Sequence, residues 1–127
     1  KGMCVGPQNA EETEQTYDTL DKQMENPYSI YNFVKQTISI RNAFPEIARG
    51  TNTFEKDLSN DNVCIFTREY NGEKAVLIFN PSKDEASVDV SSLGVNDAVA
   101  MLQTTKKAPS YKDGTAKLPA YSVLVLK

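Results

Sequence analysis

The side chains able to do acid–base chemistry in this sequence are mainly carboxylates, because it contains no histidine. Glu11-Glu12 and Asp84-Glu85 are adjacent pairs, and two carboxylates acting together can cleave a glycosidic bond. One member of such a pair needs a raised pKa to act as the acid, and a hydrophobic environment would supply it. Both pairs lie among polar residues, so we interpret them as surface charge.

Oxygen donors and aromatic rings suggest two kinds of binding site. Asn60-Asp61-Asn62 resembles an oxygen-rich calcium loop, but it lacks the sixth-position glycine and twelfth-position glutamate of an EF-hand, which favours a plain turn. Tyr70, Tyr111 and Tyr121 are candidates for stacking on sugars, although a tyrosine in a strand more often packs in the core or against a neighbouring strand. We assign no catalytic, cofactor-binding or metal-ligating residue.

The missing residue types exclude several mechanisms. Without histidine, the chain holds no Ser–His or Cys–His nucleophile system and no histidine-ligated metal. It also has no tryptophan, the richest binding residue. Two cysteines permit at most one disulfide and no zinc site of their own. We expect Cys64, in a β-rich run, to be a small buried hydrophobic side chain, whereas a bridge to Cys4 requires the chain to fold back.

Size and charge describe one ordinary globular domain. The 127 residues are 39% hydrophobic and 24% charged, a balance typical of a globular protein. A net charge of -3 gives no electrostatic reason to bind nucleic acid or an anionic membrane. No apolar run has the roughly 18 residues of a membrane span, and no signal-peptide pattern is present. The first residue is Lys1, so we expect a mature product or a piece of a longer protein.

The first of the elements that would position these groups is polar and acidic. We interpret Glu11–Met24 as a weak exposed helix or a partly ordered connector. Its carboxylates would form either a site for a cation or a basic partner, or a solvated face that helps a helix N-terminus; we favour the solvated face.

One strong helix is predicted next. Asn26 is placed as its N-cap with Pro27 at the first helical position, and Phe44-Pro45 ends it. Its apolar side chains spread over about 200° of the circumference, about twice the stripe that a surface helix needs. They are Ile30, Tyr31, Phe33, Val34, Ile38, Ile40 and Phe44. We therefore expect this helix to touch two partners.

Arg41 projects near the middle of that apolar arc. A guanidinium there must have its stem packed and its head paired, because an unpaired buried charge is very costly. We expect a structural ion pair with a carboxylate inside or beyond this chain, and an anionic ligand is the alternative.

From Gly50 onward the apolar residues alternate with the period of two that is typical of strands. Asn71-Gly72 is a strong hairpin signal, and Asp113-Gly114 is another turn. Ala75–Phe79 is continuously apolar, as expected for a central strand covered on both faces. Seven strands predict a mainly β fold, an antiparallel β-sandwich preceded by one or two α-helices. They are Thr51–Leu58, Val63–Tyr70, Lys74–Asn80, Ser87–Val90, Ala98–Leu102, Thr115–Leu118 and Tyr121–Leu126.

The joint order of several short motifs carries a family resemblance. The helix ends in Ile40-Arg41, the link ends in Phe44–Ile47, the hairpin ends in Asn80-Pro81, and Leu118–Leu126 reads Leu-Pro-Ala-Tyr-Ser-Val-Leu-Val-Leu. In this order the chain resembles the C-terminal part of an alpha-amylase superfamily enzyme, glycoside hydrolase family 13, namely the last barrel helix plus domain C. The segment Tyr28–Asn32 is especially similar to secreted bacterial alpha-amylases.

The resemblance implies two parts and a structural function. Residues 1–49 would be a connector and the final barrel-type helix, and residues 50–127 a Greek-key β-sandwich of the domain C type. The family's catalytic aspartates and glutamate precede the last helix, so we transfer no catalytic residue. The chain would stabilise the catalytic barrel of a starch-degrading, extracellular or cell-surface enzyme, by burying a flank of the helix and an apolar sheet face, and would itself be inactive.

The implied partner is the catalytic barrel of this longer enzyme, which we refer to as the parent enzyme. Weak contact with alpha-glucan and self-association of the isolated chain through its uncovered flank are further expectations, whereas nucleic acid and a membrane span are not expected. Two other functions stay open. One is a glucan-binding module that uses Tyr70 or Tyr111, and the other is an unrelated extracellular adhesion sandwich.

Overall fold

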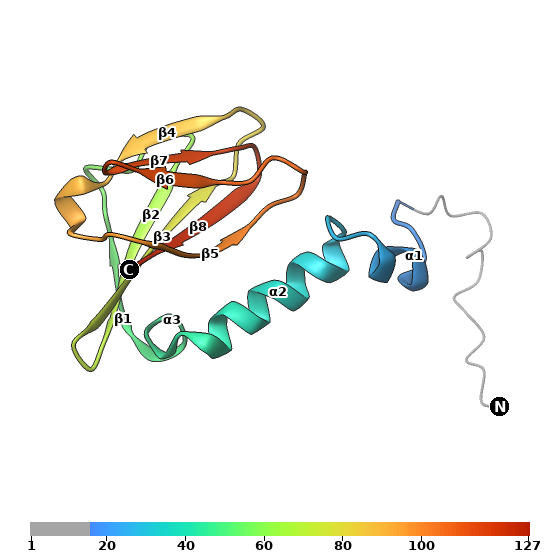
Figure 1. Ribbon diagram of the computed structural model, residues 1–127, viewed down its shortest axis with the longest axis horizontal. Coiled ribbons are helices and arrows are strands. Elements are labelled where there is room, and N and C mark those ends of the chain that lie inside the picture. Colours follow the sequence, from blue (N-terminus) through green and yellow to red (C-terminus); the bar gives the residue numbers. More distant parts are fainter. Residues whose placement is uncertain (1–15) are drawn as a thin grey trace.

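The computed structural model describes residues 16–127, in which three α-helices precede two antiparallel sheets (Figure 1). The helices are α1 (Leu20–Glu25), α2 (Ile30–Ala43) and α3 (Pro45–Arg49). None of the helices within this range is long and apolar enough to cross a membrane. The first part of the acidic segment predicted as a weak helix lies outside the described residues, and the helix found there begins only at Leu20.

The strands form a β-sandwich, which confirms the predicted fold class. The five-stranded sheet has the order β1-β2-β3-β8-β5, and the three-stranded sheet has the order β4-β7-β6. Because β8 lies between β3 and β5, the chain passes through the smaller sheet before it completes the larger one. The strands are β1 (Thr51–Phe54), β2 (Cys64–Tyr70), β3 (Glu73–Asn80), β4 (Ala86–Asp89), β5 (Ala98–Leu102), β6 (Ser110–Lys112), β7 (Thr115–Leu118) and β8 (Ser122–Leu126).

Two strands differ from the prediction. Strand β1 stops at Phe54 instead of Leu58, because the chain then turns and the Ser59 hydroxyl donates a hydrogen bond to the Glu55 carbonyl. Strand β6 was missed: its three residues pair with β7 across the Asp113-Gly114 turn, which the sequence did indicate. A strand this short leaves too few residues for alternation to be visible.

Both predicted tight turns are present. Asn71 and Gly72 have φ values of 51° and 83°, and Asp113 and Gly114 have values of 49° and 79°. Two consecutive residues with positive φ match the type I′ turn, whose twist suits a hairpin of two residues. The turns fix the β2–β3 and β6–β7 registers, and these registers decide which side chains face the core.

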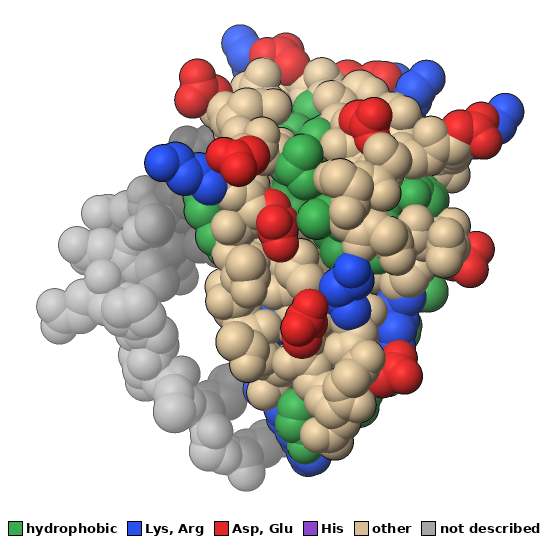
Figure 2. All heavy atoms as spheres, turned by 90° about the vertical axis from the view of Figure 1, so that its left-hand side faces the viewer, with side chains coloured by type: hydrophobic (Ala, Val, Ile, Leu, Met, Phe, Trp, Pro, Cys, Tyr) green, Lys and Arg blue, Asp and Glu red, His purple; other side chains and the backbone are tan. Residues whose placement is uncertain are grey.

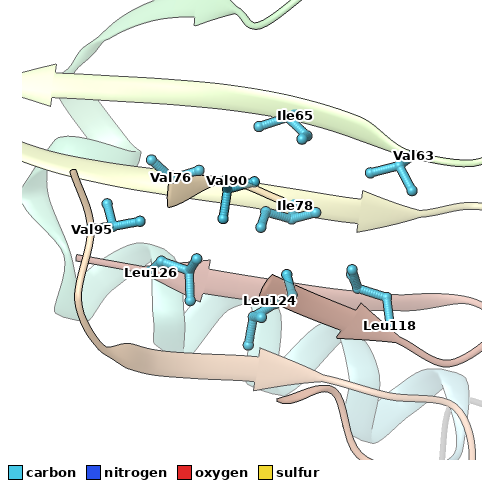
Figure 3. Packing of buried hydrophobic residues seen from close by; sticks show 10 residues of the cluster. Val63, Ile65, Val76, Ile78, Val90, Val95, Leu118, Leu124 and Leu126 are labelled. Atoms are coloured by element: carbon cyan, nitrogen blue, oxygen red, sulfur yellow. The ribbon is translucent and has the colours of Figure 1, made fainter. Parts of the chain in front are cut away.

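The hydrophobic core lies between the two sheets (Figure 3). Its largest side chains, among them Ile65, Ile78 and Leu124, have no exposed surface at all. The opposite face of β3 is less well covered, because Leu77 and Phe79 are only half-buried. The prediction of a central strand covered on both faces is therefore correct for the inner face and wrong for part of the outer one.

Candidate docking site

Helix α2 has one side near the sandwich and another side uncovered. It contacts α3 and β5, and Phe33 and Ile40 are half-buried. Ile30, Val34 and Ile38 are large and apolar, yet they are 49–54% exposed. Residues four apart lie on one face of a helix, so these three form a continuous row. No residue of α2 is buried, as expected for a helix whose apolar arc exceeds what its own domain covers.

Helix α1 extends this row into a groove. Leu20 is 59% exposed and lies beside Ile30, Val34 and Ile38 in a groove of about 530 Å³. We call these four residues the α2 stripe. The remaining lining side chains are Gln23, Tyr31, Lys35 and Ser39. Figure 1 shows that α2 runs away from the sandwich toward α1, so the groove lies on a projecting arm.

The corner between α1 and α2 is fixed by polar side chains. The Asn32 amide nitrogen donates to the carbonyls of Gln23, Met24 and Asn26 at 2.8–3.1 Å. The N-cap of α2 is Ser29, whose hydroxyl accepts from the Asn32 backbone N–H, so the predicted N-cap at Asn26 is wrong. Asn26 instead accepts from the backbone N–H two residues ahead in a local turn. The groove is therefore preformed.

A buried carboxylate fixes α3 to the sheet. Glu46 is 2% exposed, and its Oε1 lies 2.8 Å from the Nζ of Lys127, which lies 3.1 Å from Glu73 as well. The Nζ approaches Oε1 outside the geometry of a regular hydrogen bond, so we treat the contact as an ion pair. Burial alone would raise the pKa of Glu46, but Lys127 and the backbone N–H of Glu46 outweigh it and lower that pKa. Hydrogen bonds with Glu46 and Glu73 raise the pKa of Lys127.

Arg68 and Gly50 complete the junction between α3 and the sheet. The Arg68 guanidinium donates to the Glu46 carbonyl at 3.3 Å and to the Ile47 carbonyl at 3.0 Å. A Cβ atom at Gly50 would lie 2.8 Å from the Glu69 carbonyl oxygen and would also collide with the Glu46 carbonyl. Only glycine therefore lets α3 lead directly into β1. The helix entering the sandwich is held by backbone contacts as well as by charge.

Arg41 is exposed, and none of the ion pairs among residues 16–127 includes it. The expectation that its stem packs within the chain is wrong, because the apolar arc around it is itself uncovered. The predicted ion pair with a carboxylate beyond this chain stays a prediction.

The predicted sugar platform is not assembled in the described residues. The Tyr111 hydroxyl donates to the Val95 carbonyl at 2.8 Å, and its ring packs against the core. Tyr70 is half-buried beside the β2–β3 turn, whereas Tyr121 is 52% exposed. The aromatic pairs found in residues 16–127 involve phenylalanine instead: Phe54 with Phe66, and Phe66 with Phe79.

The remaining candidates behave mostly as surface features. The Asn60 side chain accepts from the backbone N–H groups of Asn62 and Val63, which makes the segment a plain turn. Residues 16–127 hold no group of three or more acidic, cysteine or histidine side chains placed to bind a metal. Asp84-Glu85 is exposed, and the Lys107 ammonium lowers the pKa of Glu85.

The cysteine predictions have a mixed outcome. Cys64 is half-buried rather than buried, because it lies on the outer face of β2, whose cover is incomplete. Cys4 and the Glu11-Glu12 pair lie outside the described residues, so the predicted disulfide stays a prediction.

Sequence reasoning missed the polar residues that hold the fold together. Asn80 is 1% exposed, and its amide nitrogen donates to the carbonyls of Asp84, Leu118 and Pro119. The Ser122 hydroxyl also donates to the Pro119 carbonyl, so the motif preceding β8 is anchored from two sides. The available signal was Asn80-Pro81 itself, which was noted as similar to the family without a physical reason.

A two-layer antiparallel sandwich joined to a projecting helix with an uncovered apolar face defines an accessory domain. The family model described as maltogenic amylase, C-terminal domain, matches residues 57–125. The chain belongs to this family of domains, which confirms the resemblance to the C-terminal part of the alpha-amylase superfamily.

Solved structures agree with this assignment. Eubacterium rectale Amy13B is 98% identical over 100% of this chain, with a TM-score of 0.93, and this chain covers 25% of it. The trehalulose synthase MutB from Pseudomonas mesoacidophila shares the fold: the identity is 22% over 84% of this chain and 19% of MutB, and the TM-score is 0.69. No curated protein matches the sequence. The chain thus spans about a quarter of Amy13B and about a fifth of MutB.

Proposed function

We propose that this chain stabilises the catalytic barrel of an alpha-amylase-type glycoside hydrolase by covering one flank of the barrel with the α2 stripe. The observation that supports this is the row of half-exposed Ile30, Val34 and Ile38 on a preformed groove. Removing apolar surface from water yields about 25 cal/mol per Å², so covering the row would stabilise both parts. The division into residues 1–49 and residues 50–127 is part of this proposal.

The distribution of exposed apolar side chains supports one docking side. Within residues 16–127, the large hydrophobic side chains that are exposed lie on the helices, the five-stranded sheet or the segments leading into them. None lies on the three-stranded sheet. They are Tyr17, Leu20, Met24, Ile30, Val34, Ile38, Phe54, Val99, Met101 and Tyr121. Figure 2 shows acidic and basic side chains spread over the end of the sandwich that lies on the left of Figure 1, as expected of a surface facing solvent.

The finer features of the parent enzyme follow from family resemblance alone. We propose that it hydrolyses alpha-1,4 glucosidic bonds of starch outside a bacterial cell, whereas this chain contributes no catalytic group. An assay on starch should therefore show hydrolysis by the parent enzyme and none by the purified chain. Hydrolysis by the chain alone would overturn the assignment of a structural domain.

The central test compares two charged substitutions on α2 in the parent enzyme and in the isolated chain. Ile38→Asp places a carboxylate in the α2 stripe, and Gln36→Asp places one on the far side of the same helix. We expect Ile38→Asp to lower the Tm of the parent by several degrees more than Gln36→Asp does. In the isolated chain the two variants should behave alike, because both positions are exposed there. Equal Tm values of the two variants in the parent would refute the proposal.

A further inference from the structure

We infer that the outer face of the five-stranded sheet carries a second docking surface for the parent enzyme, an inference that rests on the proposed function. The surface consists of Phe54, Phe66 and Phe79, which we call the aromatic strip. Ring centroids are 5.3 Å apart for Phe54 and Phe66 and 5.9 Å apart for Phe66 and Phe79. The strip is separate from the α2 stripe, which lies on the projecting helix.

Strand alternation places the strip on the face away from the core. Ile65 and Ile78 are fully buried between the sheets, and each lies next to a member of the strip along its strand. Successive side chains point to opposite faces, so Phe66 and Phe79 point outward. Phe54 lies opposite Phe66 in the register and is 48% exposed. A row of packed aromatic rings on an incompletely covered sheet face is unusual for a surface that meets only water.

The domain's own helices cover only part of this outer face. Leu102, Ala75 and Val125 lie there and are at most 6% exposed, since α2 packs by β5 and α3 packs by β2 and β3. The cover ends before the aromatic strip. Between α3 and the strip a groove of about 270 Å³ is left, lined by Ile47, Asn52, Phe66, Arg68, Leu77 and Phe79.

The chemistry of this groove favours an apolar occupant. Its one charged side chain, Arg68, already donates to two carbonyls of α3, so the groove offers hydrophobic contact rather than recognition of charge. Three quarters of Amy13B lie outside the part that matches this chain. The helices α2 and α3 lie on the same side of the sheet as the strip, so a body covering the α2 stripe lies within reach of the strip. The occupant we assign is therefore an apolar segment of the parent's catalytic part.

Cys64 is a natural reporter for this surface. It lies directly opposite Phe79 in the β2–β3 register, on the same outer face, and is half-buried. We would label a Cys4→Ser variant with a thiol reagent, in the parent enzyme and in the isolated chain, and follow the Cys64 peptide by mass spectrometry. We expect labelling about tenfold slower in the parent, because a covered thiol reacts only after local opening. Both proteins should react at the same rate when unfolded.

A substitution gives a second readout. Phe66→Thr keeps a residue suited to a strand and removes the central ring, and we expect it to lower the Tm of the parent more than that of the isolated chain. Equal Tm losses together with equal Cys64 labelling rates would overturn the second surface. The Ile38→Asp comparison would still decide the proposed function independently. Protection of Cys64 in the isolated chain that increases with its concentration would show a second copy on the strip and would also overturn the assignment.

Discussion

The two faces of the five-stranded sheet have opposite relations to the rest of the chain. On the inner face Ile65, Ile78 and Leu124 are completely buried by the chain's own second sheet. On the outer side, α2 has no buried residue and Phe54 is half-exposed. The sequence is apolar on both sides, so hydrophobicity alone does not tell which surface is covered. The difference shows that this chain completes one core and supplies half of another.

The largest expected effect tests the inner side. Leu124→Ala removes a fully buried side chain, and we expect the isolated chain to lose about 3 kcal/mol of unfolding free energy. Val34→Ala on the half-exposed row should cost less than about 1 kcal/mol in the same chain. Urea unfolding of both variants measures the contrast. Equal losses would mean that the helix is as well packed as the core.

The next effect concerns the junction between the two sides. Gly50→Ala would force backbone atoms of Glu46 and Glu69 apart, and we expect it to cost about 2–3 kcal/mol. Gly94→Ala is the matched control, because its Cβ meets open space and only the φ of 64° is unfavourable, a cost of about 1 kcal/mol. Thermal unfolding of the two variants gives the difference. A smaller loss for Gly50→Ala than for Gly94→Ala would contradict the close approach.

The ion pair at that junction predicts a pH dependence. The folded-state pKa of Glu46 is lowered, so its contribution to stability is present above the unfolded pKa near 4.5 and is lost as the pH falls through the folded pKa. The pKa of Lys127 is raised, so its contribution is lost only as the pH rises above 10.5 through the folded pKa. Glu46→Gln should lower stability at pH 7 and flatten the acid side of the stability curve. An exposed Glu69→Gln control that flattens it equally would exclude this role of Glu46.

The charge on α2 gives a smaller effect that depends on context. Arg41 is exposed in this chain, so Arg41→Met should change the unfolding free energy of the isolated chain by less than about 0.5 kcal/mol. In the parent enzyme the same variant should lower the Tm if a carboxylate of the catalytic part pairs with the guanidinium. Arg41→Lys should restore part of the loss. A loss of the same size in the isolated chain would instead indicate a partner within this chain.

The sequence was sufficient for the fold and for the oddity of α2, and insufficient for the polar contacts. Hydrophobic periodicity and two turns with glycine locate most strands, because these signals are local. The N-cap was misplaced because Asn26 and Ser29 are both good caps, and only the carbonyls that Asn32 reaches distinguish them. The roles of Glu46 and Asn80 depend on partners 81 and 38 positions away, respectively, and no spacing rule reveals such contacts.

The smallest expected effect is the response to sugar. A platform for glucan needs exposed rings with free hydrogen-bonding groups, but the Tyr111 hydroxyl is already bonded to the Val95 carbonyl. We therefore expect maltooligosaccharide at millimolar concentration to leave the NMR signals of Tyr70 and Tyr111 unchanged in the isolated chain. The signals of Tyr121, which is 52% exposed, serve as the internal control for nonspecific contact. A saturable shift confined to Tyr70 or Tyr111 would make the sandwich a binding module. It would also mean that the polar side of the molecule, rather than its apolar side, carries the function.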